Sequence, residues 1–223
     1  MISEEYHFNW SLEKMINIIL FIFVSIACYL TGSISFGRIL SRFMTGVDIT
    51  KVGSGNTGAT NVLRNSGPRL GFTVLILDML KSIIPVAIFN QLNMFELQWY
   101  VQFFALLFVI GHCYPIYNNF KGGKGVATGI GPLAIIFFPS SVVALIIFVL
   151  SITVTRYVSL GSILGCIFAL ISLVLFNLFE LFESTYYDLI YILPAVIIII
   201  YKHKENILRL LDNSENKLTF KKR

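Results

Sequence analysis

Long runs without a charged side chain dominate the pattern of hydrophobic and polar residues in this chain. Four such runs cover residues 15–37, 99–120, 125–155 and 157–179. A helix that crosses a bilayer needs about 20 consecutive apolar residues, so each run is long enough for a span. Two further apolar stretches lie at residues 70–90 and 186–201. The pattern predicts an all-α, polytopic membrane protein.

The run at residues 125–155 is too long for one straight span. As a helix it would measure about 46 Å at about 1.5 Å per residue, against a hydrocarbon core of about 30 Å. It also contains Pro139 followed by two serines, a combination that breaks helices. We therefore divide it at Pro139 and expect seven transmembrane helices in a single domain over residues 1–223. The expected spans are 16–36, 70–90, 99–117, 125–138, 140–155, 158–179 and 186–201.

The distribution of Lys and Arg indicates how these spans are oriented. The seven-span arrangement puts 15 of the 17 cations on one side, in the four segments 37–69, 118–125, 154–158 and 202–223. Cytoplasmic loops are enriched in Lys and Arg, so this side is predicted to be cytoplasmic. The N-terminus is then outside and the C-terminus cytoplasmic. We expect a lipid bilayer and no nucleic acid among the partners.

Composition supports the membrane assignment. The chain of 223 residues is 56% hydrophobic and 13% charged, with a mean hydropathy of +0.79. A soluble domain of this size would need a more polar surface. The apolar runs repeat along the chain, so a cleaved signal peptide does not explain them. The three cysteines match no metal or redox spacing, and no metal site is expected.

Four polar segments interrupt the apolar pattern, and all lie on the predicted cytoplasmic side: 51–67, 111–129, 155–162 and 201–211. The first reads KVGSGNTGATNVLRNSG and contains four glycines, two cations and no acid. Glycines let backbone N–H groups approach an anion closely. Only Glu205 supplies a carboxylate in the four segments. This pattern indicates a site for a phosphate-bearing substrate or for lipid headgroups.

Two partial nucleotide motifs in these segments are rejected. Residues 53–58 satisfy G-x-G-x-x-G, but a dinucleotide site also needs a preceding strand within a βαβ unit. Residues 122–125 resemble the end of a Walker A loop, but Gly125 stands where that motif has Ser or Thr. The glycines therefore point to an anion without pointing to a nucleotide.

Arg64 and Lys124 are the strongest candidates for phosphate binding, because each lies in a glycine-rich and hydroxyl-rich stretch. Arginine can bind a phosphate bidentately, and lysine adds a point charge. A helix that begins near Thr60 would add a favourable dipole. Side chains able to donate hydrogen bonds nearby are Ser54, Asn56, Thr60 and Asn61. For His203, flanked by two lysines, the local sequence alone predicts an exposed position.

Asp78 and Lys81 are charges inside a predicted span, three residues apart on one helical face. Charges within a membrane are costly and are usually paired or functional. We favour a structural ion pair over a direct catalytic role. His112 lies in another predicted span, where helix packing and a functional role are both open.

Taken together, the polar segments resemble the PlsY family, the bacterial integral-membrane acyl-phosphate:glycerol-3-phosphate acyltransferases. The matching stretches are GSISFGRIL, VGSGNTGATNVLR, LDMLKSIIPV, GHCYPIYNNFKGGKGVATGIG, TRYVSLGS and KHKENILRLL. They follow the family's order over about residues 30–217. The departures are mild. The family usually has proline where this chain has Ser35, and phenylalanine where it has Tyr114.

The resemblance implies seven membrane helices with the N-terminus outside, and an active site at the cytoplasmic face of the bacterial plasma membrane. It implies transfer of a fatty acyl group from acyl phosphate to the 1-hydroxyl of glycerol 3-phosphate, without metal or organic cofactor. The enzyme that forms acyl phosphate becomes a candidate partner. The residues implicated as catalytic are Ser54, Arg64, Lys124, His203 and Asn206. Those implicated in substrate binding are Asn56, Thr60, Ser159 and Ser162, and the motif does not decide between the two serines.

A mechanism follows from these residues. Acyl phosphate is already activated, so we expect direct attack by the glycerol hydroxyl without an acyl-enzyme, aided by proximity and orientation. Arg64, Lys124 and the loop N–H groups would stabilise the phosphates and the developing oxyanion. His203 is the candidate base, with a pKa lowered by its basic neighbours, and a substrate phosphate is the alternative proton acceptor.

A phosphate or phospholipid transporter is the competing hypothesis, since basic loops and charges inside spans are compatible with it. Two features argue against it. No inverted internal repeat is evident, and the polar segments gather on one predicted side.

Overall fold

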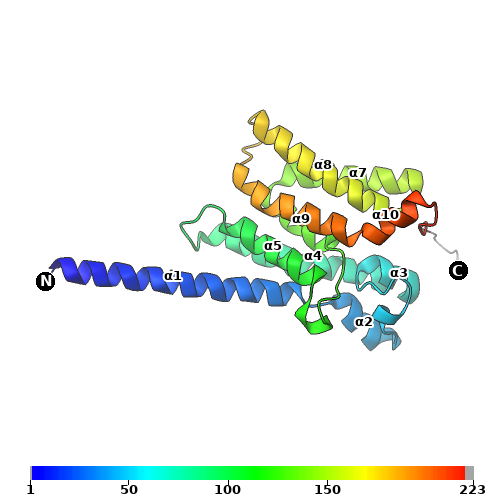
Figure 1. Ribbon diagram of the computed structural model, residues 1–223, viewed down its shortest axis with the longest axis horizontal. Helices are drawn as coiled ribbons and strands as arrows, with labels where there is room; N and C mark the ends of the chain where they lie inside the picture. The colour runs from blue at the N-terminus through cyan, green and yellow to red at the C-terminus, as the bar shows by residue number, and fades with distance from the viewer. Residues whose placement is uncertain (1, 219–223) are drawn as a thin grey trace.

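The computed structural model describes residues 2–218, with side chains from residue 12 onward, and over these residues the chain is helical without strands (Figure 1). The prediction of an all-α protein is confirmed. The helices are α1 (Ile2–Gly32), α2 (Phe36–Thr45), η1 (Ile49–Lys51), α3 (Ala59–Ser66), α4 (Pro68–Leu92), α5 (Tyr100–Cys113), η2 (Ile116–Asn118), α6 (Val126–Ile136), α7 (Phe138–Thr155), α8 (Val158–Leu178), η3 (Tyr186–Asp188), α9 (Leu189–Lys202) and α10 (Lys204–Leu211).

Several helices are long and apolar enough to cross a membrane, which makes this a multi-pass membrane protein. Within the described residues five helices meet this requirement. A sixth span is added if η3–α9 and α10, which are bent by 56° at His203, are counted as one. Helix α6 is apolar but short. Seven spans and the sides of the two termini therefore remain predictions.

The long apolar run at residues 125–155 breaks at Phe137, two residues before Pro139. Pro139 occupies the first turn of α7, where its missing N–H would have no helical partner. Helix α6 has 11 residues, so it is about 16 Å long and reaches through about half of a hydrocarbon core. The glycine-rich loop before α6 can therefore lie below the membrane surface.

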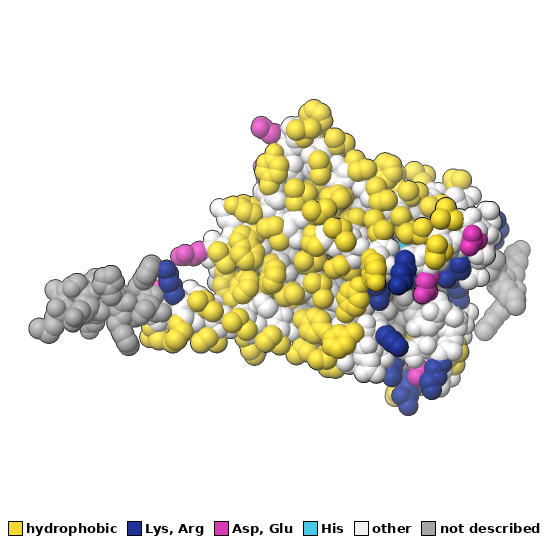
Figure 2. All heavy atoms as spheres, in the orientation of Figure 1, with side chains coloured by type: hydrophobic (Ala, Val, Ile, Leu, Met, Phe, Trp, Pro, Cys, Tyr) yellow, Lys and Arg dark blue, Asp and Glu magenta, His cyan; other side chains and the backbone are white. Residues whose placement is uncertain are grey.

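The helices form a bundle with a distinct polar end. Helix α1 runs along one edge, α5 and α9 lie centrally, and α7 and α8 cover the opposite edge (Figure 1). Apolar side chains cover the middle of the visible face, and most cations gather at the end that carries α2, α3 and α10 (Figure 2). This end contains the polar segments identified in the sequence. The tail cations Lys221, Lys222 and Arg223 lie outside the described residues.

Helix α5 anchors the core because small residues and aromatic rings let its neighbours approach closely. A Cβ on Gly32 of α1 would lie 2.6 Å from the carbonyl oxygen of Phe108, so only glycine permits this helix crossing. Toward the other end of α1, Phe21 packs against rings of α5 and of the preceding loop, including Phe95 and Phe104, with centroids 5.1–5.4 Å apart. These contacts fix α1 on α5, which carries His112 toward the polar end.

The predicted ion pair between Asp78 and Lys81 is confirmed. Lys81 Nζ donates to Asp78 Oδ1 at 2.8 Å and to the carbonyl oxygen of Ile34 at 2.8 Å, and it lies 3.0 Å from His112 Nδ1. All three side chains are buried. The three protons of the ammonium thus have three acceptors. The buried pair joins α4, α5 and the connection between α1 and α2 beneath the polar end, and His112 contacts it.

Candidate active site

A cavity of about 1770 Å³ opens at the polar end of the bundle and extends between the apolar helices. Its polar part is lined by residues from the first loop, α3, the loop before α6, the start of α8 and α10. Its apolar part is lined by α4, α6, α7, α8 and α9, with small side chains such as Gly165 and Ala169 along α8. A single cavity therefore joins a polar mouth to a hydrocarbon-like interior.

The first loop, residues 52–58, is folded around the buried side chain of Asn61. Its amide nitrogen donates to three backbone carbonyls, those of Ile49, Val52 and Asn56, at 2.9–3.1 Å. Its Oδ1 accepts the backbone N–H of Ser54 at 3.1 Å. Asn61 was expected to donate to the substrate, but its donors are used inside the loop. It shapes the loop.

Other predicted residues of the first loop lie around the mouth of the cavity. Asn56 Oδ1 accepts the backbone N–H of Gly58 at 3.0 Å, which turns the chain into α3. Helix α3 begins at Ala59, one residue before the expected Thr60. Ser54, Asn56, Thr60 and Arg64 all line the cavity. Arg64 is exposed and donates from Nη2 to the carbonyl oxygen of Asn216 at 2.9 Å.

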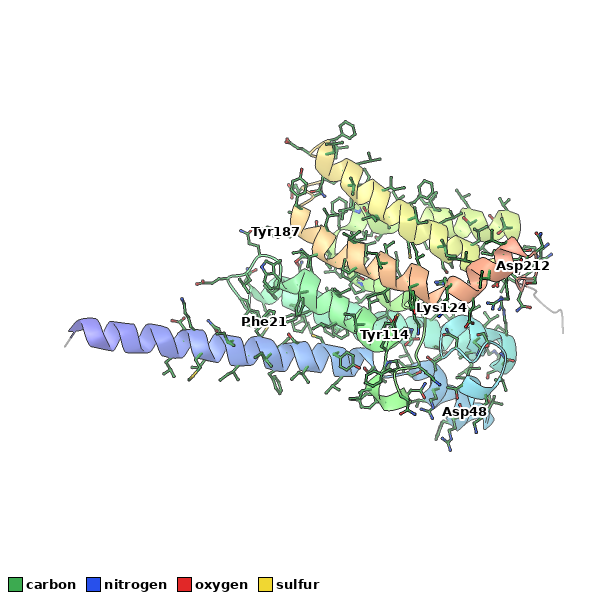
Figure 3. All side chains as sticks on the ribbon, in the orientation of Figure 1. Phe21, Asp48, Tyr114, Lys124, Tyr187 and Asp212 are labelled. Atoms are coloured by element: carbon green, nitrogen blue, oxygen red, sulfur yellow. The ribbon has the colours of Figure 1, made fainter. Side chains whose placement is uncertain are left out.

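The second loop places Lys124 at the cavity through close backbone packing. The backbone N–H of Gly123 donates to the carbonyl oxygen of His112 at 3.0 Å. Gly125 has φ +83°, and a Cβ there would lie 2.8 Å from Cys113 Sγ, so both conformation and space require glycine. Figure 3 shows Lys124 near the bend between α9 and α10. Its Nζ donates to Asn206 Oδ1.

The predicted residues of the last segments meet Lys124 at the same place. Asn206 and Ser159 are buried and line the cavity with Lys124. Ser162 also lines it, but its hydroxyl donates to the carbonyl oxygen of Val158 at 2.9 Å. Ser159 instead points to the polar cluster, as its contact with Glu215 shows. The contacts therefore distinguish the two serines, with Ser159 in the polar cluster, and the role of either in substrate binding stays a prediction.

Glu215 lies at the centre of this cluster, although the sequence analysis did not identify it. Its Oε1 accepts from Asn206 Nδ2 at 2.8 Å and from Ser159 Oγ at 3.0 Å, and its Oε2 accepts from Arg209 Nε at 2.8 Å. The carboxylate is 7% exposed. Glu215 lies four residues beyond the last polar segment, so the site has a buried carboxylate besides the few acids expected, and this carboxylate connects α8 with α10.

The segment that carries Glu215 crosses the mouth of the cavity after α10. Leu218 donates its backbone N–H to the carbonyl oxygen of Arg156 at 2.7 Å, and Lys217 Nζ lies 5.6 Å from the centre of the Tyr157 ring. Arg64 holds the same segment through Asn216. In the sequence, Glu215 is an acid six residues after Arg209 in a basic tail. That signal is too weak to identify it as a site residue.

Burial and charge set the ionisation of the cluster. Burial would raise the pKa of Glu215, but hydrogen bonds from Arg209, Asn206 and Ser159 outweigh it and lower that pKa. Burial lowers the pKa of Lys124 to about 8, with Arg209 and Arg64 adding to the effect and Glu215 opposing it. Partial desolvation at the cavity mouth lowers the pKa of Arg64 in the same direction, although much of its side chain is exposed. Lys124 is therefore mostly an ammonium at pH 7 and loses its proton as the pH rises through about 8.

His203 is 2% exposed, so the surface position predicted from its lysine neighbours is wrong. The bend between α9 and α10 turns its ring inward. Burial, followed by the charge of Lys124, lowers the pKa of His203 to about 4. The direction agrees with the prediction, but the flanking lysines are not the cause. Its Nδ1 lies 2.7 Å from the carbonyl oxygen of Ile199, which requires Nδ1–H and leaves Nε2 as an acceptor.

The described residues contain no group of three or more His, Cys, Asp or Glu side chains arranged to hold a metal ion. Cys28, Cys113 and Cys166 are free thiols at buried or partly buried positions. The chemistry available at the mouth of the cavity is that of several cations, one carboxylate paired with Arg209, an imidazole, amides and hydroxyls.

Comparison with known proteins identifies the family of this chain. The family model described as "Glycerol-3-phosphate acyltransferase" matches residues 22–213. A glycerol-3-phosphate acyltransferase of Halalkalibacterium halodurans is 44% identical over 201 residues, which are 88% of this chain and 95% of that protein. One of Aquifex aeolicus is 43% identical over 202 residues, 88% and 98% of the two chains.

Two solved structures share the fold. Both are crystal structures of PlsY, an integral membrane glycerol 3-phosphate acyltransferase, in a glycerol 3-phosphate form and a lysophosphatidic acid form. The TM-scores are 0.80 and 0.78, each at 36% identity and covering 89% of this chain. The matched region of those chains is 96% and 95% of their length. By sequence and by fold, this chain belongs to the PlsY family of glycerol-3-phosphate acyltransferases.

Proposed function

We propose that this protein transfers a fatty acyl group from acyl phosphate to the 1-hydroxyl of glycerol 3-phosphate, releasing lysophosphatidic acid and inorganic phosphate. One observation carries the proposal: Arg64, Lys124 and Asn206 converge at the polar mouth of a cavity whose interior is apolar. Phosphates fit the mouth and a fatty acyl chain fits the interior. Glycerol 3-phosphate and lysophosphatidic acid are also the ligands named for the related PlsY structures.

In this proposal the cations and loop donors hold two phosphates while the acyl carbonyl lies between them. Arg64 offers a bidentate guanidinium and Lys124 a point charge. Ser54, Asn56 and Thr60 would supply donors from the first loop. Ser159, Ser162 and Asn206 line the opposite wall, where Glu215 accepts from Ser159 and Asn206, and the second amide proton of Asn206 can reach the substrate. The chemistry of these residues requires no metal or organic cofactor.

The proposed reaction is a direct displacement. The glycerol O1 forms a bond with the acyl carbonyl carbon, the bond from that carbon to the phosphate oxygen breaks, and phosphate leaves with the bonding electrons. The cations would stabilise the developing oxyanion and the leaving phosphate. Binding both substrates in one site lowers the entropic part of the barrier, so no acyl-enzyme is needed.

The hydroxyl proton has two candidate acceptors. His203 Nε2 is free to accept, but a pKa of about 4 makes the imidazole a weak base. A substrate phosphate, with a second pKa near about 6 in phosphate monoesters, is the stronger acceptor. The pH profile of His203→Ala separates them: loss of a limb between pH 4 and 7 identifies His203 as the base, whereas an unchanged profile with lower turnover favours the phosphate.

We also propose that the chain is one membrane domain with seven spans, N-terminus outside, in the bacterial plasma membrane. The charge distribution supports this orientation, since the cations gather at the end that carries the cavity mouth (Figure 2). The active site then faces the cytoplasm, where glycerol 3-phosphate and the enzyme that forms acyl phosphate would reach it. A transporter needs polar side chains near the middle of the bilayer, whereas here the polar side chains gather at one end, which argues against transport.

The donor assay tests the function directly. Purified protein in detergent is given glycerol 3-phosphate with palmitoyl phosphate, palmitoyl-CoA or palmitoyl-acyl carrier protein. The proposal expects lysophosphatidic acid only from palmitoyl phosphate. Equal rates with palmitoyl-CoA would refute the donor assignment while leaving the acceptor intact.

Site variants test the residue assignment. Arg64→Ala and Lys124→Ala should each lower kcat/KM by about 10²–10³-fold, the usual cost of removing one preorganised donor. Lys51→Ala is the matched control, because Lys51 is an exposed cation that does not line the cavity. Near-normal rates in either site variant would remove that residue from the site.

A further inference from the structure

The polar end of the bundle carries a patch of exposed apolar side chains that the active site does not use. We call it the interfacial patch; it combines one face of α2 with the loop 115–121. Its apolar members are 48–88% exposed and are Ile39, Phe43, Met44, Ile116, Tyr117 and Phe120. Arg38 Nη1 donates to Asn118 Oδ1 at 2.7 Å and joins the two parts. Soluble surfaces rarely expose so many large apolar side chains together.

Helix α2 has three distinct sides. The small residues Gly37 and Ser41 are buried against the protein. Ile39 and Phe43, one turn apart, point outward, and Phe43 is 88% exposed. Arg42 lies on the third side and is exposed. A helix with a strongly apolar face beside a cationic one binds at a membrane interface.

The loop 115–121 presents its apolar side chains with local backbone strain. Asn119 has φ +48° and Phe120 has φ +59°, a left-handed conformation that is unfavourable for an aromatic residue. The backbone N–H of Phe120 donates to the carbonyl oxygen of Pro115 at 2.9 Å and holds this turn, while the residue is 58% exposed. Insertion of the ring into lipid would supply the missing burial.

The charge of the patch fits an anionic surface. Arg42 and Lys121 are exposed, and Arg38 is half-buried beside them. The acid of the adjoining segment, Asp48, is engaged by Thr50, whose hydroxyl and backbone N–H donate to Oδ1 at 2.6 and 3.1 Å. Each Lys or Arg near an anionic membrane surface contributes about 1 kcal/mol of attraction, equivalent to a roughly fivefold local enrichment of anionic lipid.

We propose that α2 and the loop 115–121 form an interfacial anchor, which lies in the headgroup region of the leaflet on the cationic side and binds anionic phospholipid headgroups. The anchor supports both substrate loops. Gly37 of α2 is pressed against the backbone of Thr57, and residues 122–124 follow the loop directly. Anionic lipid at the patch therefore fixes the loops that carry Asn56 and Lys124. The choice of leaflet rests on the proposed orientation, whereas contact with lipid does not.

Fluorescence quenching tests the depth and the headgroup preference without measuring activity. Phe43→Trp and Phe120→Trp are introduced into a Trp10→Phe, Trp99→Phe background and reconstituted in vesicles of phosphatidylcholine and phosphatidylglycerol, with bromine on one lipid at a time. Phe23 lies on α1 and is 68% exposed, so Phe23→Trp is the reference for a side chain in lipid. Asp212 is exposed at the polar end, so Asp212→Trp is the reference for a side chain in water. Tyr117→Trp replaces Phe120→Trp if that variant does not fold.

The anchor predicts quenching at positions 43 and 120 by bromine close to the headgroups, and stronger quenching when phosphatidylglycerol carries the bromine. Arg42→Gln and Lys121→Gln should each reduce that preference about fivefold. The Phe23→Trp signal should show no headgroup preference. Quenching by aqueous iodide equal to that of Asp212→Trp, with none by brominated lipid, would overturn the anchor. Equal quenching by the two brominated lipids would overturn the anionic recognition.

Discussion

Replacing Glu215 by glutamine is the sharpest test of the site geometry. The side chain keeps its size but loses its charge, and its new amide nitrogen meets Arg209 Nε, a donor facing a donor. In the wild type the two oxygens of the carboxylate accept from three donors, Ser159 on α8 and Asn206 and Arg209 on α10. The substitution therefore loosens the segment after α10 without emptying the space it fills.

The magnitude follows from the three contacts. Ser159 and Asn206 keep an oxygen acceptor, but a neutral one, and charge-assisted hydrogen bonds are about twice as strong as neutral ones, so each loses about 1 kcal/mol. The Arg209 side chain is 33% exposed, which limits the loss of that ion pair to about 1 kcal/mol. The total of about 2–3 kcal/mol corresponds to roughly 30- to 150-fold easier detachment of the segment.

Hydrogen–deuterium exchange measures this detachment. The backbone N–H of Leu218, bonded to the carbonyl oxygen of Arg156 at 2.7 Å, should exchange faster by that factor in Glu215→Gln. The contribution of Glu215 to stability has a defined pH dependence. Its folded pKa is below its unfolded value, so the contribution is complete above the unfolded pKa and is lost as pH falls through the folded one. Wild-type exchange should approach that of the variant in acid.

The same variant should change the pH profile of catalysis. Glu215 supports the pKa of Lys124 against burial, so its loss should move the alkaline fall in kcat/KM from about pH 8 to a lower pH. Asp212→Asn is the control, because Asp212 is an exposed acid at the C-terminal end of the same α10 and does not line the cavity. If Glu215→Gln leaves both the exchange rate at Leu218 and the alkaline limb of kcat/KM unchanged, the central position of this carboxylate is refuted.

Three further predictions concern other parts of the molecule. Asp78→Asn should destabilise the protein by about 3–5 kcal/mol, seen as a lower Tm in detergent, because it leaves the buried Lys81 ammonium without its partner; an unchanged Tm contradicts this. Gly37→Ala should raise KM for glycerol 3-phosphate, since its methyl group would overlap the carbonyl oxygen of Thr57. Ser159→Ala should reduce kcat/KM more than Ser162→Ala, and the reverse order would overturn the separation of the two serines.

The sequence predicted the features that are local along the chain. Helix α3 begins beside the expected Thr60, because Asn56 and the loop glycines encode that turn within a few residues. The pairing of Asp78 with Lys81 follows from one helical turn. The family motifs fixed the candidate set, since motif residues lie in continuous stretches.

Features that depend on distant contacts were not predictable from the sequence. Glu215 meets Ser159 across 56 residues, and no local pattern marks either as a partner. His203 is buried because α9 bends there by 56° and Lys124 arrives from another loop, neither of which its lysine neighbours indicate. Asn61 was expected to contact substrate, and only the folded loop reveals that its amide is used internally.

Product stoichiometry tests the central claim most directly. Purified protein is mixed with palmitoyl phosphate, and inorganic phosphate and lysophosphatidic acid are followed together with and without glycerol 3-phosphate. Direct acyl transfer at the Arg64–Lys124 mouth predicts equal amounts of both products with the acceptor present, and no phosphate release in its absence. A burst of phosphate equal to the enzyme concentration, without glycerol 3-phosphate, would contradict direct attack and require an acyl-enzyme.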